Sequence, residues 1–589
     1  MAQGFESHIE VEWAASASAS AYKIFRSDNG GADFTLLKQV GNTTFSFDWT
    51  GDEGQNLTRQ YKVKALGTGG TESSFSPLAS ATTQPMGDEA LLDMVQHATF
   101  RYFWDYGHPV SGMARERNNG NANLVTTGGS GFGIMAIVAA AERGWVSRAE
   151  AVDRLIKIAS FLEFADRFHG AFPHWINGTN GNVIPFSQYD DGADLVETAF
   201  MMQGLLAARQ YFDQDVPLEN GLRSVITGLW EDVEWDWFRK NNGPVLYWHW
   251  SPNYAWQMNF PLRGFFEAQI VYILAVASPT HPVPASLYQS GWTSSNYANP
   301  STHYGYPIYC GPFAGGPLFF AHYSYLGFDP RHKKDAFCNY FIRNRNHSLI
   351  QRAYCTANPE GHEGYSADCW GLTASDDPFG YLAHDLWPSN DNGTISPTAA
   401  LSSMPYTPPE SMAALKYFYR TQGENLWGPY GFYDAFNLDE NWYADSYLAI
   451  DQGPIVAMIE NHRSGLLWDK FMQNSEIQPA LDAIGFQVDN TSSGETRPAK
   501  IGFSVNIFPN PEPVRGALRL EFSILEPQIL NAAIFDSGGK KQTVFSNRSM
   551  SPGVSVESFP LGSLLPGMYF LQIQSSNYQI LTRKIVVVP

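Results

Sequence analysis

One carboxyl group in this chain lies where a general acid would be expected. Residues 192–209 are predicted to form a helix, because they lack proline, are rich in Ala, Leu and Met, and repeat apolar residues about every 3.6 positions. Glu197 lies inside this apolar run, one helical turn after Asp194. Burial favours a neutral carboxyl and a neighbouring negative charge raises its pKa further, so Glu197 is predicted to donate a proton near neutral pH. A helix N-terminus also attracts acidic residues, which accounts for Asp194 better than for Glu197.

Hydrolysis of a glycosidic bond uses two carboxyl groups that flank the bond. A catalytic role for Glu197 in such a reaction therefore requires a second carboxyl group. Asp376 closes a short segment that begins at Trp370, and Pro378 prevents a helix from continuing there. We predict that Asp376 points into a cleft and activates water. An ordinary Asp-Asp-Pro turn explains the same residues equally well.

Further polar and aromatic residues could hold a sugar chain. Asp194, Glu267 and Asp451 lie at or within apolar helices, and Arg263 precedes Glu267. Asp451 could instead be only a helix N-cap. Tryptophan rings are the usual platforms for sugar rings, although each could equally serve packing. The predicted stacking residues are Trp175, Trp248, Trp250, Trp370 and Trp387.

The composition limits the partners of this chain. The formal net charge of −20 argues against nucleic acid and favours a neutral ligand, and aromatic residues make up 14% of the sequence. No P-loop, nucleophile elbow or zinc-ligand spacing occurs, so we expect no cofactor and no metal. The four cysteines, at 310, 338, 355 and 369, are free thiols or form one or two disulfides. No apolar run is long enough to span a membrane, and an exported protein would have lost its signal peptide.

The chain divides by its periodicity. Residues 1–84 alternate like the strands of a β-sandwich, 85–478 carry at least eleven helical runs, 479–500 are polar like a linker, and 501–589 return to alternation. Paired helices with long loops at one end predict an (α/α)6 barrel. The fold class is therefore a central all-α barrel between two β-sandwiches. The predicted helices are 88–103, 131–143, 147–168, 192–211, 218–238, 262–277, 318–325, 333–349, 409–421, 448–461 and 464–472, with 367–372 or 397–403 as a twelfth.

Both flanking segments resemble known modules. Trp13 and the strands 22–26 and 61–65 resemble a fibronectin type III domain, which implies a spacer or stabilising role more than glycan binding. Residues 508–511, 536–540 and 565–569 resemble the anchors of the C-terminal sorting domain of type IX secretion. That resemblance implies export by the type IX machinery to the cell surface or the medium. Another spacer sandwich is the alternative.

The central segment resembles the glucoamylase-like domain of bacterial polysaccharide-degrading proteins, which includes the endo-β-1,2-glucanases of glycoside hydrolase family 144. The motifs that carry this resemblance are 127–133, Glu197-Thr-Ala-Phe200, 278–282, 370–376, 395–400, 431–434 and 450–455. The resemblance implies an (α/α)6 barrel and inverting hydrolysis of β-1,2-glucan. It places the acid at Glu197 and the base at Asp376, with an indirect proton path through a substrate hydroxyl or a water chain.

We therefore expect a monomeric, exported glycoside hydrolase acting on a neutral β-glucan. A polysaccharide lyase is the first alternative, and it would need a basic cleft for uronates. A glycan-binding accessory protein without catalysis is the second.

Overall fold

The computed structural model describes two compact units, which divide after residue 492. The described residues are 1–294, 297–489, 503–508, 512–513, 517–524, 527–536, 541–560, 564, 567–575 and 580–588. No helix among them is long and apolar enough to cross a bilayer.

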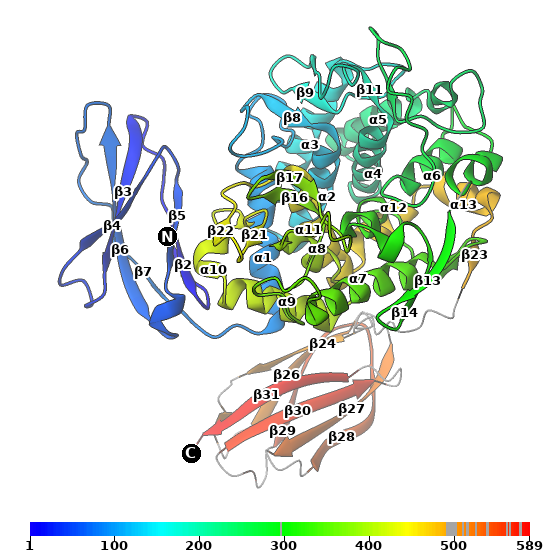
Figure 1. The fold of residues 1–589 in the computed structure, drawn as a ribbon. Helices are drawn as coiled ribbons and strands as arrows, with labels where there is room; N and C mark the ends of the chain where they lie inside the picture. Colours follow the sequence, from blue (N-terminus) through cyan, green and yellow to red (C-terminus); the bar gives the residue numbers. More distant parts are fainter. Residues whose placement is uncertain are drawn as a thin grey trace. The chain divides into compact units, whose positions relative to one another are not determined.

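Helices dominate the first unit from residue 88 onward, as Figure 1 shows. Loops with short strands connect them, and several of these strands carry the candidate site described below. The helices are α1 (Asp88–Trp104), α2 (Thr127–Arg143), α3 (Arg148–Phe164), α4 (Leu195–Tyr211), α5 (Pro217–Glu231), α6 (Gln269–Ala277), α7 (Tyr340–Ala357), α8 (Pro397–Ser402), α9 (Pro408–Arg420), α10 (Gly423–Leu426), α11 (Ala449–Arg463), α12 (Leu466–Met472) and α13 (Ile477–Ile484). This part is therefore helix-rich, with β segments on both sides of it in the sequence.

Most predicted helices form, and the exceptions have local causes. The helix expected from residue 262 begins only at Gln269, because Gly264 adopts a left-handed conformation with φ of 89°. The run 318–325 forms two short 3-10 turns, η5 (Leu318–Ala321) and η6 (Tyr323–Tyr325). Residues 333–334 pair as strand β15, and α7 starts after Asn339, whose side chain accepts a hydrogen bond from Ile342 N–H.

The boundary of the expected linker needs correction. Residues 477–484 form the amphipathic helix α13, whose residues Ile477, Leu481 and Ile484 are buried, so the polar segment does not begin at residue 479. The rest of the expected linker, from residue 490, lies outside the described residues.

Helices α2 and α4 pack against each other through glycines. A Cβ atom on Gly131 would lie 2.3 Å from the carbonyl oxygen of Phe200, and one on Gly204 would lie 2.1 Å from the carbonyl oxygen of Gly131. The glycine-rich run 127–133 therefore lets two helix backbones approach closely.

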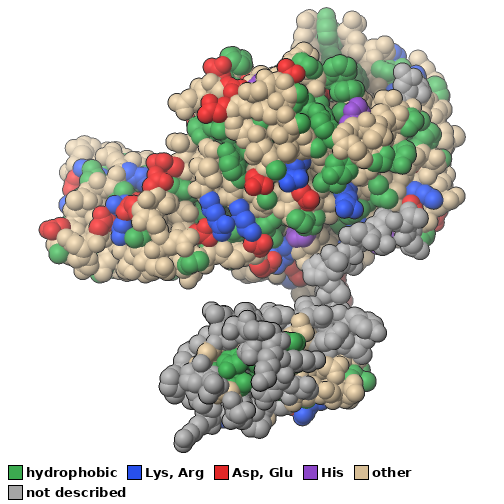
Figure 2. All heavy atoms as spheres, turned by 60° about the horizontal axis from the view of Figure 1, so that its bottom comes forward, with side chains coloured by type: hydrophobic (Ala, Val, Ile, Leu, Met, Phe, Trp, Pro, Cys, Tyr) green, Lys and Arg blue, Asp and Glu red, His purple; other side chains and the backbone are tan. Residues whose placement is uncertain are grey.

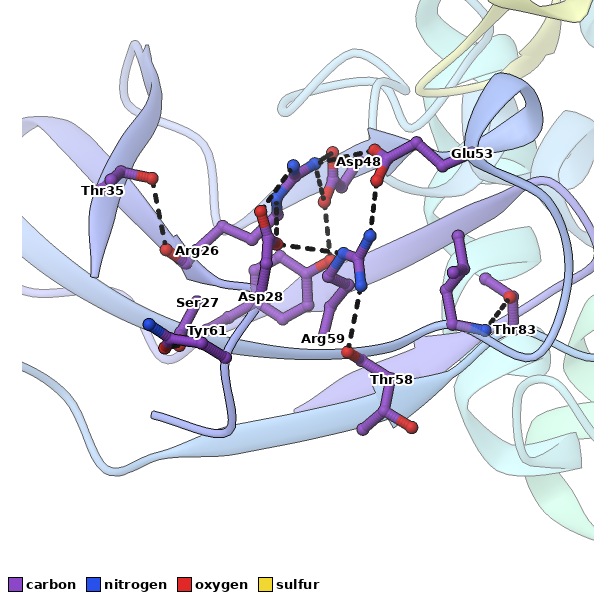
Figure 3. Close-up of polar contacts among 12 residues, drawn as sticks. Arg26, Ser27, Asp28, Thr35, Asp48, Glu53, Thr58, Arg59, Tyr61 and Thr83 are labelled. Atoms are coloured by element: carbon purple, nitrogen blue, oxygen red, sulfur yellow. Dashed lines mark hydrogen bonds and ion pairs between the residues drawn. The ribbon is translucent and has the colours of Figure 1, made fainter. Parts of the chain in front are cut away.

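The N-terminal segment forms two sheets, ordered β1-β2-β5 and β4-β3-β6-β7. A polar network joins them (Figure 3): buried Asp48 on β5 accepts hydrogen bonds from Tyr61 on β6 and from Arg26 on β3. Arg59 and Glu53 extend the network to the surface. The strands are β1 (Ala2–Gly4), β2 (His8–Glu12), β3 (Ala19–Ser27), β4 (Thr35–Val40), β5 (Phe45–Trp49), β6 (Thr58–Gly67) and β7 (Ala79–Thr82).

These sheets are anchored to the helices. Tyr419 on α9 hydrogen-bonds through its hydroxyl group to Nδ1 of His8 at 2.7 Å and accepts Ser7 N–H at 3.1 Å. Trp49 packs edge-on against Tyr419, and Arg420 pairs with buried Glu6. The N-terminal sheets therefore share a polar and aromatic interface with the helical part.

The second unit consists of two sheets, ordered β24-β26-β29 and β25-β31-β30-β27-β28. Their buried side chains form a core that includes Leu520, Phe522, Leu571 and Ile585. Most residues of the predicted sorting anchors at 508–511, 536–540 and 565–569 lie outside the described residues. The strands are β24 (Phe503–Phe508), β25 (Glu512–Pro513), β26 (Ala517–Ile524), β27 (Gln528–Asp536), β28 (Lys541–Met550), β29 (Gly553–Pro560), β30 (Gly567–Ser575) and β31 (Ile580–Val588).

Candidate active site

Segments from across the first unit meet around a cavity of about 520 Å³. Glu197 enters it from the first turn of α4, Trp175 from strand β9 (Trp175–Asn177), and Tyr381 from strand β17 (Gly380–Ala383). The remaining residues around it are Glu116, Arg117, Thr126, His174, Phe186, Phe200, Trp248, Glu267, Phe319, Tyr323, Ala374, Ala383, Leu448 and Ile450. The cavity is thus aromatic, with three glutamates and a single arginine among its lining side chains.

A second cavity, of about 640 Å³, adjoins the first. Trp248, Glu267 and Phe319 line both cavities, and Arg263 and Asn299 line only the second. The two cavities therefore lie next to each other, with Glu267 at their shared wall.

Glu197 is held by the start of two helices. Its Oε2 accepts the backbone N–H of Gly128 at 2.6 Å, at the first turn of α2. A Cβ atom on Gly128 would lie 2.6 Å from the same oxygen, so glycine is required for this approach. Burial raises the pKa of Glu197, which is 6% exposed, whereas the His174 cation and the Gly128 N–H oppose that rise.

Asp194 organises the residues beside Glu197. It caps α4 by accepting N–H groups of Val196 and Glu197 at 3.0 and 2.9 Å, and it also accepts Trp248 Nε1–H at 2.8 Å. His174 Nδ1 lies 3.0 Å from its other oxygen. Burial opposes the charge of Asp194, but the hydrogen bond from His174 and the nearby histidines lower its pKa. Asp194 is fully buried, so it positions Glu197 and Trp248 instead of touching a sugar.

Three acidic groups balance the charge of His174. Burial alone would lower the pKa of His174, but Glu197, Asp194 and Asp190 raise it to about 9. Burial and the charge of Asp194 raise the pKa of Asp190 to about 7. His249, whose Nε2 lies 3.4 Å from Asp190, has its pKa lowered by burial. The cluster therefore holds one imidazolium cation among carboxyl groups near neutral pH.

The same cluster is the group of side chains best placed for a metal ion among the described residues. Ligand atoms of His174, Asp190 and Asp194 lie within 4.8 Å of one another. A protonated imidazole cannot coordinate a metal, and both oxygens of Asp194 already accept hydrogen bonds. These residues are better explained as a charged hydrogen-bond network.

Among the described residues, Glu267 is the acidic residue that lines both cavities. It precedes α6, and burial raises its pKa to about 8. Among the described residues its carboxyl group makes no hydrogen bond to another side chain. A protonated carboxyl without such a partner is free to donate its proton to a ligand.

Asp376 lies on strand β16 (Ala374–Asp377), next to the cavity but not among the described residues that line it. Arg117 Nη1 contacts its carboxylate at 3.2 Å, and the Ser446 hydroxyl donates to it at 2.6 Å. The side chain is 14% exposed. Arg117 lines the cavity and also pairs with Glu116. It therefore connects Asp376 to the cavity lining.

Behind Asp376 are two buried aspartates. Asp434 accepts the backbone N–H of Asp376 at 2.8 Å, and burial together with the Asp376 charge raises its pKa to about 7. Burial and Asp434 raise the pKa of Asp451, which lies on α11 and is 1% exposed. Tyr323 links Asp451 to the cavity by a hydroxyl contact of 3.4 Å.

The predicted tryptophans separate into two groups. Trp175 and Trp248 line the first cavity, and Trp175 packs on Phe186. Trp370 is fully buried in a hydrophobic core, so its predicted stacking role is corrected to packing. Trp250 packs on His169, and Trp387, 49% exposed, packs on Phe313; neither lines the two cavities described above.

Several cavity residues were not singled out from the sequence, notably Glu116, Arg117, His174, Phe186 and Tyr323. His174 precedes a predicted residue, Trp175, and its polar ring in an aromatic stretch was the only available signal. Arg117 carried none, because its partner Asp376 lies 259 positions away.

Comparisons with known proteins give this site its context. The family described as "Putative glucoamylase" matches residues 259–475. A relative from Parabacteroides distasonis, named exo β-1,2-glucooligosaccharide sophorohydrolase (non-reducing end), is 45% identical over 505 residues, which cover 82% of this chain and 70% of the relative. The chain belongs to the glucoamylase-like family. This glucoamylase-like protein is a glycoside hydrolase.

Solved structures agree with the family assignment. A β-1,2-glucanase from Parabacteroides distasonis matches with a TM-score of 0.79 and 44% identity, covering 82% of this chain and 72% of that one. An endo-β-1,2-glucanase from Chitinophaga pinensis, solved with sophorotriose and glucose, matches with a TM-score of 0.67 and 52% identity, covering 68% and 99%.

A second family, the secretion system C-terminal sorting domain, matches residues 506–588. The glucoamylase-like hydrolase is therefore exported by the type IX machinery to the cell surface or the medium, as the sequence predicted.

Proposed function

We propose that this hydrolase cleaves β-1,2-glucan with inversion, using one carboxyl group in the first cavity as the acid and a second carboxyl group next to that cavity as the base. The observation that carries the proposal is the position of Glu197 in an aromatic cavity, where burial raises its pKa, with Asp376 linked to the same cavity through Arg117. The activities named for the curated relative and for the solved structure from Parabacteroides distasonis support the linkage.

The charge of the cavities favours a neutral substrate over a uronate. Arg117 and Arg263 are the only Lys or Arg side chains among the described residues that line the two cavities, and Arg117 is already paired with Glu116 and Asp376. A lyase must neutralise a uronate carboxylate, which would be repelled by Glu116, Glu197 and Glu267. Figure 2 also shows acidic and basic side chains interspersed on one face of the first unit.

We assign the proton donor to Glu197 first. Its carboxyl is fixed by Gly128 and Thr126, while Asp194 fixes the backbone beneath it. Glu267 is the second candidate, because its pKa of about 8 keeps it protonated at neutral pH. Asp376 is the proposed base, and a water chain past Arg117 would connect it to the reacting centre.

Substrates with different leaving groups distinguish the candidate residues. A β-1,2-linked oligosaccharide needs protonation of its leaving oxygen, whereas an aryl glycoside with an acidic phenol does not. We expect the variant of the true acid to lose the first activity and to retain most of the second. Loss of both activities in Glu197→Gln, with retention of the aryl activity in Glu267→Gln, would reassign the acid to Glu267.

Product analysis tests the rest of the proposal. Released oligosaccharides should carry the α-anomeric configuration at first, as NMR spectroscopy would show, because inversion of a β linkage produces it. An unsaturated product absorbing in the ultraviolet would instead support the lyase. Binding without released reducing ends would support an accessory protein.

We also propose the finer architecture. The helices of the central segment are inferred to close into an (α/α)6 barrel, with residues 1–84 as a fibronectin type III-like sandwich and the protein as a monomer. The alternation of helices with site-bearing loops supports the barrel, and the two N-terminal sheets support the sandwich. Sedimentation of the purified protein would test the monomer.

A further inference from the structure

Two of the four cysteines lie together beside the second cavity. Cys310 ends strand β14 (Tyr306–Cys310), and Cys338 directly precedes Asn339, the N-cap of α7. Their sulfur atoms are 3.0 Å apart, and both residues are buried. A covalent disulfide requires about 2.05 Å, so the two sulfurs need to approach by only about 1 Å.

Each cysteine is fixed by neighbouring contacts. Cys338 N–H donates to Asp335 Oδ1 at 3.0 Å, and Asp335 also accepts the hydroxyl groups of Tyr288 and Tyr340. The carbonyl oxygen of Cys310 accepts Arg343 Nε–H at 3.3 Å. These hydrogen bonds hold the backbone of both cysteines in position. A disulfide could therefore form with little further rearrangement of the backbone.

We propose that Cys310 and Cys338 form a disulfide in the exported protein, and that this bond fixes the wall of the second cavity. Gly311 and Pro312, which follow Cys310 directly, line that cavity. The bond closes a segment of 28 positions that begins at the end of strand β14 and contains the turns η5 and η6 and strand β15. Export through the type IX pathway exposes the chain to an oxidising compartment, where such bonds persist.

The reaction is a thiol–disulfide exchange with an exported thiol oxidase, or with oxidised glutathione in vitro. One thiolate of the pair attacks the disulfide of the oxidant and releases one oxidant thiol. The second thiolate then attacks the mixed disulfide, forms the Cys310–Cys338 bond and releases the other thiol. The two cysteines lose two electrons and two protons, and the oxidant disulfide gains them.

The other two cysteines provide an internal control. Cys355 and Cys369 are both buried, but among the described residues no hydrogen bond joins their sulfur atoms, unlike those of Cys310 and Cys338. The Cys369 thiol lies against Tyr417 instead. We therefore expect these two to remain thiols under conditions in which the first pair is oxidised.

Peptide mapping of the full chain, exported by a host with an intact type IX pathway, tests the pairing directly. Alkylation before reduction should label Cys355 and Cys369, and digestion should yield one peptide pair linked through Cys310 and Cys338. The intact mass should rise by two hydrogen atoms on reduction. Alkylated Cys310 and Cys338 in the exported protein, which stay unlinked after refolding with oxidised glutathione, would overturn the proposal.

A double-mutant comparison gives an independent test. Cys310→Ala and Cys338→Ala should each lower Tm by about 5 °C, and the double variant by no more than either single one, because all three lack the same bond. Additive falls, equal in oxidised and reduced protein, would mean that the two side chains only pack, and would overturn the proposal. Both tests are independent of glycan cleavage, so they can fail while the proposed function stands.

Discussion

Two acidic clusters lie at or next to the first cavity, and they balance their charges differently. Beside Glu197, the positive charge is His174, a group that can lose its proton. Beside Asp376, it is Arg117, which remains charged at any physiological pH. The first cluster can therefore exchange protons with a ligand and solvent through its cation, whereas the cation of the second cluster cannot. This difference suits an acid in the cluster of Glu197 and a base in the cluster of Asp376.

Removal of the proposed acid, Glu197, should have the largest effect on activity. We expect Glu197→Gln to reduce kcat on β-1,2-glucan by about 10³-fold, because an amide cannot protonate the leaving oxygen. Glu267→Gln is the matched variant, and it should cost less if Glu197 is the donor. Reducing-end release measures both, and an unchanged Tm confirms that the fold persists. A Glu197→Gln protein with more than a tenth of wild-type activity would contradict the assignment.

The second cluster should respond to loss of its carboxylate. Asp376→Asn is expected to lower kcat by about 10²-fold, because water loses the group that would take its proton. Ser446→Ala removes only one hydrogen bond to the same carboxylate and should change kcat by less than about tenfold. Similar effects of the two substitutions would indicate that the carboxylate serves structure and not catalysis.

Replacement of His174, the cation that can lose its proton, tests how that charge affects the pKa of Glu197. A cation lowers the pKa of a neighbouring carboxyl, so His174→Gln should raise the pKa of Glu197. The basic limb of the kcat profile should therefore move upward by about one pH unit. His169→Gln, which changes a histidine outside the cavity lining, is the control. A basic limb that stays in place would mean that another group, such as Glu267, sets it.

The smallest effect concerns stability. The folded pKa of Glu267, about 8, lies above its ordinary value of 4.5, so its stabilising contribution is complete below about pH 4.5 and is lost as pH rises through 8. We expect Tm to fall from pH 7 to pH 9 by about 2 °C less in Glu267→Gln than in the wild type. In Asp434→Asn, the fall of Tm with rising pH should be smaller than in the wild type mainly below pH 7, because the folded pKa of Asp434 is about 7. Differential scanning calorimetry at pH 5, 7 and 9 separates the two, and parallel curves for wild type and Glu267→Gln would contradict this account.

The sequence pattern within a single segment predicted the features that depend only on that segment. The helix around Glu197 and its cap Asp194 follow from residues within one segment, and the structure places Glu197 at the cavity. Trp248 and Trp370 were both predicted to stack on sugar rings, yet one lines a cavity and the other is wholly buried. Only the tertiary packing distinguishes them. The pairing of Arg117 with Asp376 likewise depends on contacts between distant segments and could not be derived from spacing.

The interface around Tyr419 has a consequence for how the enzyme unfolds and how it can be dissected. His8, Trp49 and Glu6 contribute both apolar surface and paired polar groups to α9, so separation would leave a charged group and an aromatic face newly in contact with water. The first 84 residues should therefore melt together with the helices in one cooperative transition. A shortened protein that starts at the first helix would need replacements on α9 before it could stay in solution.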